Sequence, residues 1–363
     1  MHIKTLQLKN FRNYGDFSID LKEGLNFIIG KNATGKTNIL EAIYFLEIGK
    51  SHRTNINQEL IKWNEEFSLI KALARRRERD ITIEVSLFKA GRRQIKVNGI
   101  EIKRLGLREK PILAVIFTPD HLKIVKEMPE YRRSYLDEIL EKTKPDYGYW
   151  RQQYLKILKQ RNMLLKKVYI GRMKQDVIDY WDKQLAGAGV RIIAARAVIT
   201  KKLEEQASRS YKKISGSDMP LTLSYENQLL GENNSLELIE ERFLFELKGR
   251  RRAEIERGQT LVGPHRDDVG IYMGGIDLRT FGSQGEQRSA SLALKMAELS
   301  IIEEVSKDQP VLLFDDVMSE LDHTRREALL KQVENGVQVI ITSTHADYLK
   351  EMDEMSANVI RIF

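Results

Sequence analysis

The chain contains no cysteine, which excludes disulfide bonds, thiolate metal sites and cysteine nucleophiles together. It also has no apolar run approaching the roughly 18 residues that a membrane-crossing helix needs. The first residues, MHIKTLQLKNF, hold no apolar stretch of signal-peptide length. Because the lack of cysteine also fits a reducing compartment, we expect a soluble, cytoplasmic protein with no membrane partner.

Internal repeats and low-complexity linkers are absent as well. A length of 363 residues is enough for two or three domain-sized cores. With 42% hydrophobic and 31% charged residues, the composition is that of a folded globular protein and not of a disordered chain.

Positive charge exceeds negative charge, with a net charge of +8 and a pI near 9.3. This balance favours acidic partners such as nucleic acid, although a thermophile-like surface rich in Lys, Arg and Glu would give it too. No zinc-finger, helix-turn-helix or RRM signature is present, so any DNA contact should neutralise phosphates without reading bases. The basic clusters are residues 75–77 with Arg79, 92–93, 132–133, 166–167, 201–202 and 250–252.

The hydrophobic pattern changes twice along the chain. Residues 1–30 alternate in short strand-like runs, residues 81–97 have the pattern of a β-hairpin, and residues 111–117 that of a buried strand. From about residue 130 to 214 the spacing predicts two long amphipathic helices joined by a short turn, which form an antiparallel hairpin. Further elements are expected as a strand after Asp218, a helix at 235–250, and apolar strands at 311–314 and 337–342.

These changes divide the chain into an α/β domain in two sequence halves and a helical insertion. We expect the α/β domain to comprise residues 1–125 and 250–363, and the insertion to comprise residues 126–249, a short helical arm.

One segment matches the phosphate-binding pattern G-x-x-x-x-G-K-[ST]. The strand-like LNFII precedes it and the helical NILEAIYFL follows it, which makes an ordinary glycine-containing turn the weaker interpretation. Lys36 is expected to reach the β- and γ-phosphates of ATP, and Thr37 to ligate Mg²⁺. The expected ATP-binding residues are Gly30, Lys31, Asn32, Ala33, Thr34, Gly35, Lys36 and Thr37.

A second group of candidates lies near the end of the chain. The apolar run VLLF ends in Asp315, the candidate metal ligand, and Asp316, which is placed to polarise an attacking water. One strand later, His345 stands where a γ-phosphate sensor would lie, although a lone histidine after a strand is more often structural.

A second anion-binding turn precedes these acids. Ser283, Gln284 and Gly285 open an apolar helix, and backbone N–H groups at a helix N-terminus attract anions. Taken alone, the pattern also fits a capped helix that binds nothing.

The order of these motifs resembles the ABC-type ATPase heads of the SMC family, and within it the bacterial recombination mediators. The resemblance covers nearly the whole chain. It is carried by LKNFRNY (8–14), GKNATGKTN (30–38), GKSHRT (49–54), FTPDHLKIVK (117–126), RRSYLD (132–137), GPHRDD (263–268), GSQGEQRSASLALKMAE (282–298) and LLFDDVMSELD (312–322).

The resemblance implies an ATP-dependent homodimer. In it, the turn at Ser283, Gln284 and Gly285 of one subunit, here called the signature turn, closes over the ATP of the other. Ser283 and Gly285 would contact the γ-phosphate in trans, and Asp322 would lie at the dimer seam. It also implies binding to duplex DNA near single-strand gaps. There the protein would act with RecO and RecR to load RecA onto strands coated with single-strand-binding protein.

Two positions depart from transporter-type heads. Gln284 replaces a glycine of the signature, and Asp316 stands where those heads carry glutamate. The shorter carboxylate lies farther from the attacking water, so we do not expect rapid hydrolysis. The resemblance implies weak ATPase activity that serves as a switch and not as a motor. Two alternatives are a transporter-type ATPase subunit and an SMC-like DNA-bridging protein whose arm mainly docks other proteins.

Overall fold

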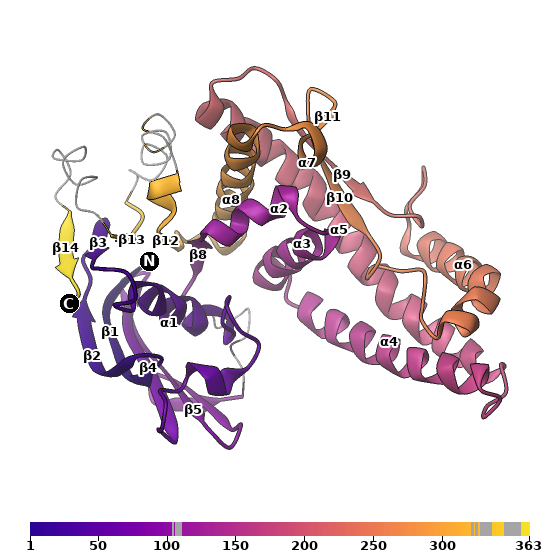
Figure 1. Ribbon diagram of the computed structural model, residues 1–363, viewed down its shortest axis with the longest axis horizontal. Helices are drawn as coiled ribbons and strands as arrows, with labels where there is room; N and C mark the ends of the chain where they lie inside the picture. Colours follow the sequence, from indigo (N-terminus) through magenta and orange to yellow (C-terminus); the bar gives the residue numbers. More distant parts are fainter. Residues whose placement is uncertain (104, 106–110, 321–322, 324–325, 327–335, 345–356) are drawn as a thin grey trace. The chain divides into compact units, whose positions relative to one another are not determined.

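The computed structural model describes residues 1–103, 105, 111–320, 323, 326, 336–344 and 357–363. The chain forms two compact units, each assembled from separate stretches of sequence (Figure 1). Unit 1 comprises Met1–Leu122, Lys212–Ser217 and Ser291–Phe363, and unit 2 comprises Lys123–Tyr211 and Asp218–Ala290. Residues 250–290, which we expected in the α/β domain, lie in unit 2.

The larger sheet of unit 1 is antiparallel, with the strand order β2-β1-β4-β5-β6-β7. In β4, every second residue from Ser68 to Ala74 is buried, so one face of the strand packs on the core. The strands are β1 (His2–Phe11), β2 (Tyr14–Asp20), β4 (Phe67–Arg76), β5 (Arg79–Phe88), β6 (Arg93–Val97) and β7 (Ile100–Ile102).

The smaller sheet of unit 1 is parallel, with the order β14-β3-β13-β12-β8. Its central strands are buried on both faces, as their continuous apolar runs predict. The strands are β3 (Leu25–Ile29), β8 (Ala114–Phe117), β12 (Val311–Asp315), β13 (Val339–Ser343) and β14 (Asn358–Arg361).

Helix α1 (Lys36–Ile48) contacts β8, β12 and β13 of the parallel sheet and β4 and β5 of the antiparallel sheet. Its side chains are buried nearly all round, as expected for a helix enclosed by a core. This burial fixes the start of α1, which is where the phosphate-binding loop ends. Unit 1 also contains the 3₁₀ turns η1 (Asn57–Leu60), η3 (Pro119–Leu122) and η4 (Val317–Glu320), and helix α8 (Gln284–Ser306) has residues in both units.

Unit 2 is mainly helical, with a three-stranded sheet in the order β11-β10-β9. Its helices are α2 (Lys123–Lys126), α3 (Pro129–Thr143), α4 (Tyr147–Tyr169), α5 (Val177–Ser215), α6 (Leu236–Arg257) and α7 (Leu278–Phe281). The end of α5, from Lys212 onward, belongs to unit 1. Its strands are β9 (Leu221–Glu226), β10 (Asp268–Met273) and β11 (Ile276–Asp277). Among the helices that the structure describes, none combines the length and apolar character of a membrane span.

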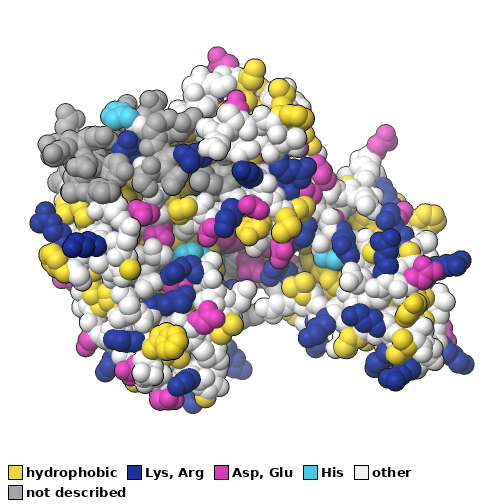
Figure 2. Space-filling view, viewed as in Figure 1, with side chains coloured by type: hydrophobic (Ala, Val, Ile, Leu, Met, Phe, Trp, Pro, Cys, Tyr) yellow, Lys and Arg dark blue, Asp and Glu magenta, His cyan; other side chains and the backbone are white. Residues whose placement is uncertain are grey.

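The expected helical hairpin is formed by α4 and α5. The Arg191 guanidinium lies 4.2 Å from the ring centroid of Trp150, and Arg161 pairs with Asp182 at 2.7 Å. Trp150, the earlier of the two α4 residues, meets Arg191, the later of the two α5 residues, and Arg161 meets the earlier Asp182, so the two helices run antiparallel. Figure 2 shows that Lys and Arg side chains gather over the end of unit 2 that α4 and α6 share.

The fully buried side chain of Arg161, in α4, contacts α5, α6 and the segment that follows α6. Its guanidinium donates to Asp182 at 2.7 Å, to Glu254 of α6 at 2.6 Å and to the Thr260 hydroxyl at 2.8 Å. A buried cation is tolerated only with such partners, so this cluster ties α4 to α5 and α6.

A second buried polar network in unit 2 contains His265. Its Nε2–H donates to the Thr260 carbonyl at 3.1 Å, so its Nδ1 accepts from the Tyr154 hydroxyl at 2.6 Å. Burial lowers the pKa of His265 to about 4, because the charged ring would lose its water. The histidine is therefore neutral at physiological pH and holds α4 against the segment that leads into β10.

Replacing His265 by glutamine should reveal this depressed pKa. The unfolded chain binds a proton at His265 below about pH 6.5, whereas the folded chain does so only near pH 4. The contribution of His265 to stability is therefore present above pH 6.5 and is lost as the pH falls toward 4. The free-energy difference between wild type and His265→Gln, from urea unfolding, should shrink by about 2 kcal/mol between pH 7.5 and pH 4.5. A difference that stays constant with pH would contradict a neutral, buried His265.

Candidate nucleotide-binding site

The loop between β3 and α1 has the backbone shape of a phosphate cradle. Gly35 has φ +101° and Ala33 φ +66°, so the chain turns sharply just before the helix begins. At Gly30 a Cβ atom would lie 2.6 Å from the carbonyl oxygen of Ile362, so only glycine allows this close approach. The loop therefore delivers its N–H groups at the N-terminus of α1, where anions are stabilised.

Lys36 folds back over this loop. Its ammonium donates to the carbonyl oxygens of Gly30 at 2.8 Å and Lys31 at 2.9 Å. A flexible, mostly buried cation held by backbone carbonyls can exchange those acceptors for phosphate oxygens.

Thr37 and Asp315 meet directly beside the loop. The Thr37 hydroxyl donates to the Asp315 carboxylate at 2.8 Å, although the residues are 278 positions apart in the chain. The same carboxylate oxygen accepts from the Thr342 hydroxyl at 2.9 Å. Since β12 and β13 are parallel neighbours, their carboxyl ends bring Asp315 and Thr342 to one edge of the sheet.

These oxygens suit a magnesium ion that also binds phosphates. Mg²⁺ prefers oxygen ligands and takes only one or two from the protein when a nucleotide supplies others. Among the described residues no group of three or more His, Cys, Asp or Glu could hold a metal. The Thr37 hydroxyl and the Asp315 carboxylate are two oxygens of the kind that Mg²⁺ prefers.

Asp316 follows Asp315 in an unusual conformation. Its φ of +55° lies in the left-handed region, which aspartate tolerates better than most residues. Its backbone N–H donates to the Thr342 hydroxyl at 3.1 Å. Thr342 thus accepts from the backbone N–H of Asp316 and donates to the side chain of Asp315, a role that the sequence did not reveal.

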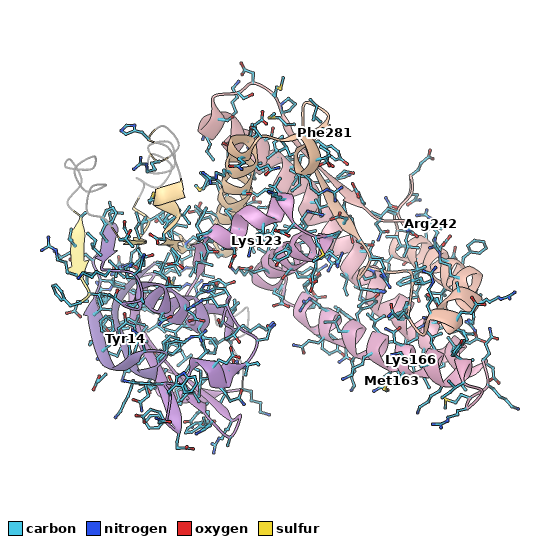
Figure 3. All side chains as sticks on the ribbon, in the orientation of Figure 1. Tyr14, Lys123, Met163, Lys166, Arg242 and Phe281 are labelled. Atoms are coloured by element: carbon cyan, nitrogen blue, oxygen red, sulfur yellow. The ribbon has the colours of Figure 1, made fainter. Side chains whose placement is uncertain are left out.

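The turn between β1 and β2 supports the loop from outside. The Asn13 amide donates to the Thr34 carbonyl at 3.1 Å, and the Asn38 amide donates to Asn13 at 2.8 Å. Tyr14 (labelled in Figure 3) directs its hydroxyl to the same Thr34 carbonyl at 3.5 Å. Burial raises the pKa of Tyr14 to about 12, so the phenol keeps its proton.

A buried carboxylate connects this turn to α1. Arg12 donates to both oxygens of Glu41 at 2.9 and 2.7 Å, and Ser51 donates to Glu41 at 2.5 Å. Burial alone would raise the pKa of Glu41, but hydrogen bonds from Arg12 and Ser51 and the charges of Arg12 and Arg53 outweigh it and lower the pKa. The motifs LKNFRNY and GKSHRT therefore converge on one residue of the helix that carries Lys36 and Thr37.

The signature turn belongs to unit 2 and is capped by its own side chains. The N–H and hydroxyl of Ser283 donate to the Glu286 carboxylate at 2.7 and 2.8 Å, and the Glu286 N–H donates back to the Ser283 hydroxyl at 3.3 Å. This reciprocal capping box places Ser283 at the exposed start of α8, with Gln284 and Gly285 in its first turn. Phe281, two residues earlier, is 75% exposed (Figure 3).

The structure thus brings the loop residues, Thr37 and Asp315 together, with Asp316 adjacent to them. Asp322 and His345, the residues expected at the dimer seam and at the γ-phosphate, lie outside the described residues. Their roles, and that of the signature turn, remain predictions.

A family model described as "RecF/RecN/SMC N terminal domain" matches residues 2–361. The chain is 41% identical over 362 residues to the "DNA replication and repair protein RecF" of Clostridium tetani, covering 100% of this chain and 98% of that protein. It is 40% identical, with the same coverage, to the protein of that name from Clostridium acetobutylicum.

Solved structures agree with this match. A structure described as the recombination mediator protein RecF-ATPrS in the RecFOR pathway has a TM-score of 0.90 at 38% identity, covering 95% of this chain and 93% of that one. An Smc head bound to the C-winged helix domain of ScpA has a TM-score of 0.53 at 18% identity, covering 95% and 90%. The second likeness concerns the fold alone. The expected α/β fold of an SMC-type ATPase head is confirmed.

Proposed function

Because the chain belongs to the RecF family of SMC-type ATPases, we propose that it is an ATP-dependent mediator of recombination in DNA replication and repair. ATP would join two copies of the chain, the dimer would hold duplex DNA near single-strand gaps, and slow hydrolysis would release it.

One observation carries the nucleotide part of this proposal: the 2.8 Å contact between Thr37 and Asp315 beside the loop of residues 30–37. The loop offers N–H donors and the Lys36 ammonium to the phosphates. The solved relatives are described as complexes with ATP and ATPrS, which supports ATP as the ligand here.

We propose that Thr37 and Asp315 would hold the Mg²⁺ that accompanies the nucleotide. The bound ion would neutralise charge that develops on the phosphates during hydrolysis. Asp316 lies next to Asp315 and would orient the attacking water. A carboxylate one methylene shorter than glutamate reaches less far, which supports turnover at the rate of a switch.

The signature turn would complete the site of a second copy. Ser283 and Gly285 lie at the N-terminus of a helix of 23 residues, and the first turn of such a helix attracts anions. On this proposal the γ-phosphate held by one subunit replaces the Glu286 carboxylate as the acceptor for Ser283 of the other. Asp322 would lie at the seam, and His345 would contact the γ-phosphate.

The relatives' descriptions place RecF in the RecFOR pathway, which supports RecO and RecR as partners of this chain. Through them it would promote the loading of RecA on single strands, in the cytoplasm. The transporter-type alternative has no support among the relatives reported above, which match over the full chain as replication and repair proteins.

DNA-binding isotherms with duplex, single-stranded and gapped DNA, recorded with and without ATP, test this proposal. The molar mass should be measured in parallel by light scattering. We expect a mass near 42.1 kDa without nucleotide that doubles with ATP and Mg²⁺, together with tighter binding to duplex and gapped DNA. A protein that stays monomeric and binds DNA equally with and without ATP would contradict the proposal.

A further inference from the structure

Helix α4 and the loop after it carry charge of one sign only. Between Asp146 and Asp176 the sequence contains no acidic residue, although the whole chain has 52. The basic residues of this segment are Arg151, Lys156, Lys159, Arg161, Lys166, Lys167, Arg172 and Lys174.

Two of these cations are used inside unit 2. Arg151 donates to Asp137 at 2.7 Å, and Arg161 pairs with Asp182 and Glu254. The other six are exposed, and none forms an ion pair with any residue that the structure describes. We call these six residues, Lys156, Lys159, Lys166, Lys167, Arg172 and Lys174, the α4 strip.

The lysines of the strip follow one another at helical spacing. Lys156 and Lys159 are three positions apart, and Lys166 and Lys167 come seven to eight positions after Lys159, two turns further along. The four span about 16 Å of helix axis at 1.5 Å per residue. Exposed apolar side chains stand among them, including Met163, which is 43% exposed and is labelled beside Lys166 in Figure 3.

Several other basic clusters of the chain are already neutralised. Arg75 and Lys4 both pair with Asp80, and Arg76 pairs with Asp308 at 2.6 Å. In α6, the side chains of Arg250, Arg251 and Arg252 pair with Glu246, with Asp179 and Asp182, and with Glu256, respectively. Compared with these clusters, the α4 strip carries positive charge that has no acidic partner among the described residues.

We propose that the α4 strip binds the phosphate backbone of duplex DNA. This inference rests on the proposed DNA-binding function and identifies a surface for it. A row of lysines without acids matches a polyanion, whereas lysine is depleted at protein–protein interfaces. Lysine ammonium groups act as point charges on phosphates and do not read bases, so binding through the strip is independent of sequence.

The test compares wild type with a variant in which Lys156, Lys159, Lys166 and Lys167 are glutamine. Glutamine removes the charge, and substitutions at exposed positions usually change stability little. With ATP and a random-sequence duplex, the variant should bind about 100-fold more weakly at 0.1 M salt. The slope of log K against log salt, which is negative, should become shallower by about 2 to 4, since each lost phosphate contact contributes about 0.9.

A matched control carries Lys71→Gln, Lys89→Gln, Arg250→Gln and Arg252→Gln. It also lowers the net charge from +8 by four, but each of these cations has an acidic partner in the structure. We expect the control to keep the wild-type salt slope and an affinity within a few-fold of wild type. Circular dichroism should confirm that both variants are folded.

Three results would overturn the proposal while leaving DNA binding in place. They are an α4-strip variant that binds duplex DNA like wild type, an equal loss in strip variant and control, and a strip variant that keeps DNA affinity but loses affinity for a polyglutamate peptide. The third would make the strip a protein-docking surface. Wild type that binds no DNA at all would instead remove the DNA-binding function itself, and the strip proposal with it.

Discussion

Replacing Lys36 by methionine should raise the dissociation constant for ATP about 100-fold, which corresponds to about 2.7 kcal/mol. Lys36 is mostly buried at the mouth of the loop, and its ammonium is within reach of anions bound there. Methionine retains a similar stem but removes the charge, so the phosphates lose their charge-assisted donor. Titration with a fluorescent ATP analogue and Mg²⁺ measures the change.

Lys22→Met is the matched control for this experiment. Lys22 is an exposed lysine of the same unit, on the segment that leads into β3, and the substitution removes the same charge. It should bind the analogue within about two-fold of wild type, as expected for a surface position. Equal affinity in Lys36→Met and wild type would show that the loop does not bind the phosphates through Lys36.

Ser283→Arg should abolish ATP-dependent dimerisation while ATP binding to the monomer stays within a few-fold of wild type. Ser283 is exposed at the start of α8, where the γ-phosphate of a second copy would approach. An arginine there fills that space and removes the hydroxyl and its cap, which costs about 1 kcal/mol of stability. Light scattering gives the mass, and the same nucleotide titration gives the affinity.

The control is Ser235→Arg, which makes the same substitution at the exposed N-cap of α6. It loses a comparable cap, because Ser235 accepts from the Leu238 N–H in the same way. It should still dimerise with ATP. If Ser283→Arg also dimerised normally, the signature turn would not complete the site of another copy.

Much of the fold could be predicted because its signals are local. The strand, loop and helix at residues 25–48, the hairpin around residues 79–97 and the long helices α4 and α5 follow from hydrophobic period and turn residues. Strands β4 and β10 were not predicted, although β4 shows the alternating pattern of a half-buried strand.

The assembly of those elements depends on contacts between distant residues. The sequence of β1 does not indicate that it pairs with β4, which lies 60 to 70 residues later in the chain. Likewise, the sequence of α1 does not indicate that two sheets enclose it. Pairing is decided by which faces bury apolar area together, and local pattern does not encode partner choice.

The residues of the candidate site also fall into those that could be predicted from the sequence and those that could not. Lys36, Thr37 and Asp315 could be found because phosphate and magnesium chemistry requires their residue types at fixed places along strand and helix. Asn13, Glu41 and Thr342 could not, since ordinary polar residues support the loop only after folding brings them beside it.

In the proposed function, each ATP lies between two copies of the chain. Lys36→Met leaves the signature turn intact, whereas Ser283→Arg leaves the loop intact. A heterodimer of the two variants therefore contains one complete site, made of the loop of the Ser283→Arg copy and the signature turn of the Lys36→Met copy. Each variant alone should remain monomeric with ATP and Mg²⁺. When tagged Lys36→Met is mixed with untagged Ser283→Arg, the tagged protein should capture the other only in the presence of ATP. If the mixture stays monomeric like its components, the two sites are not shared in this way.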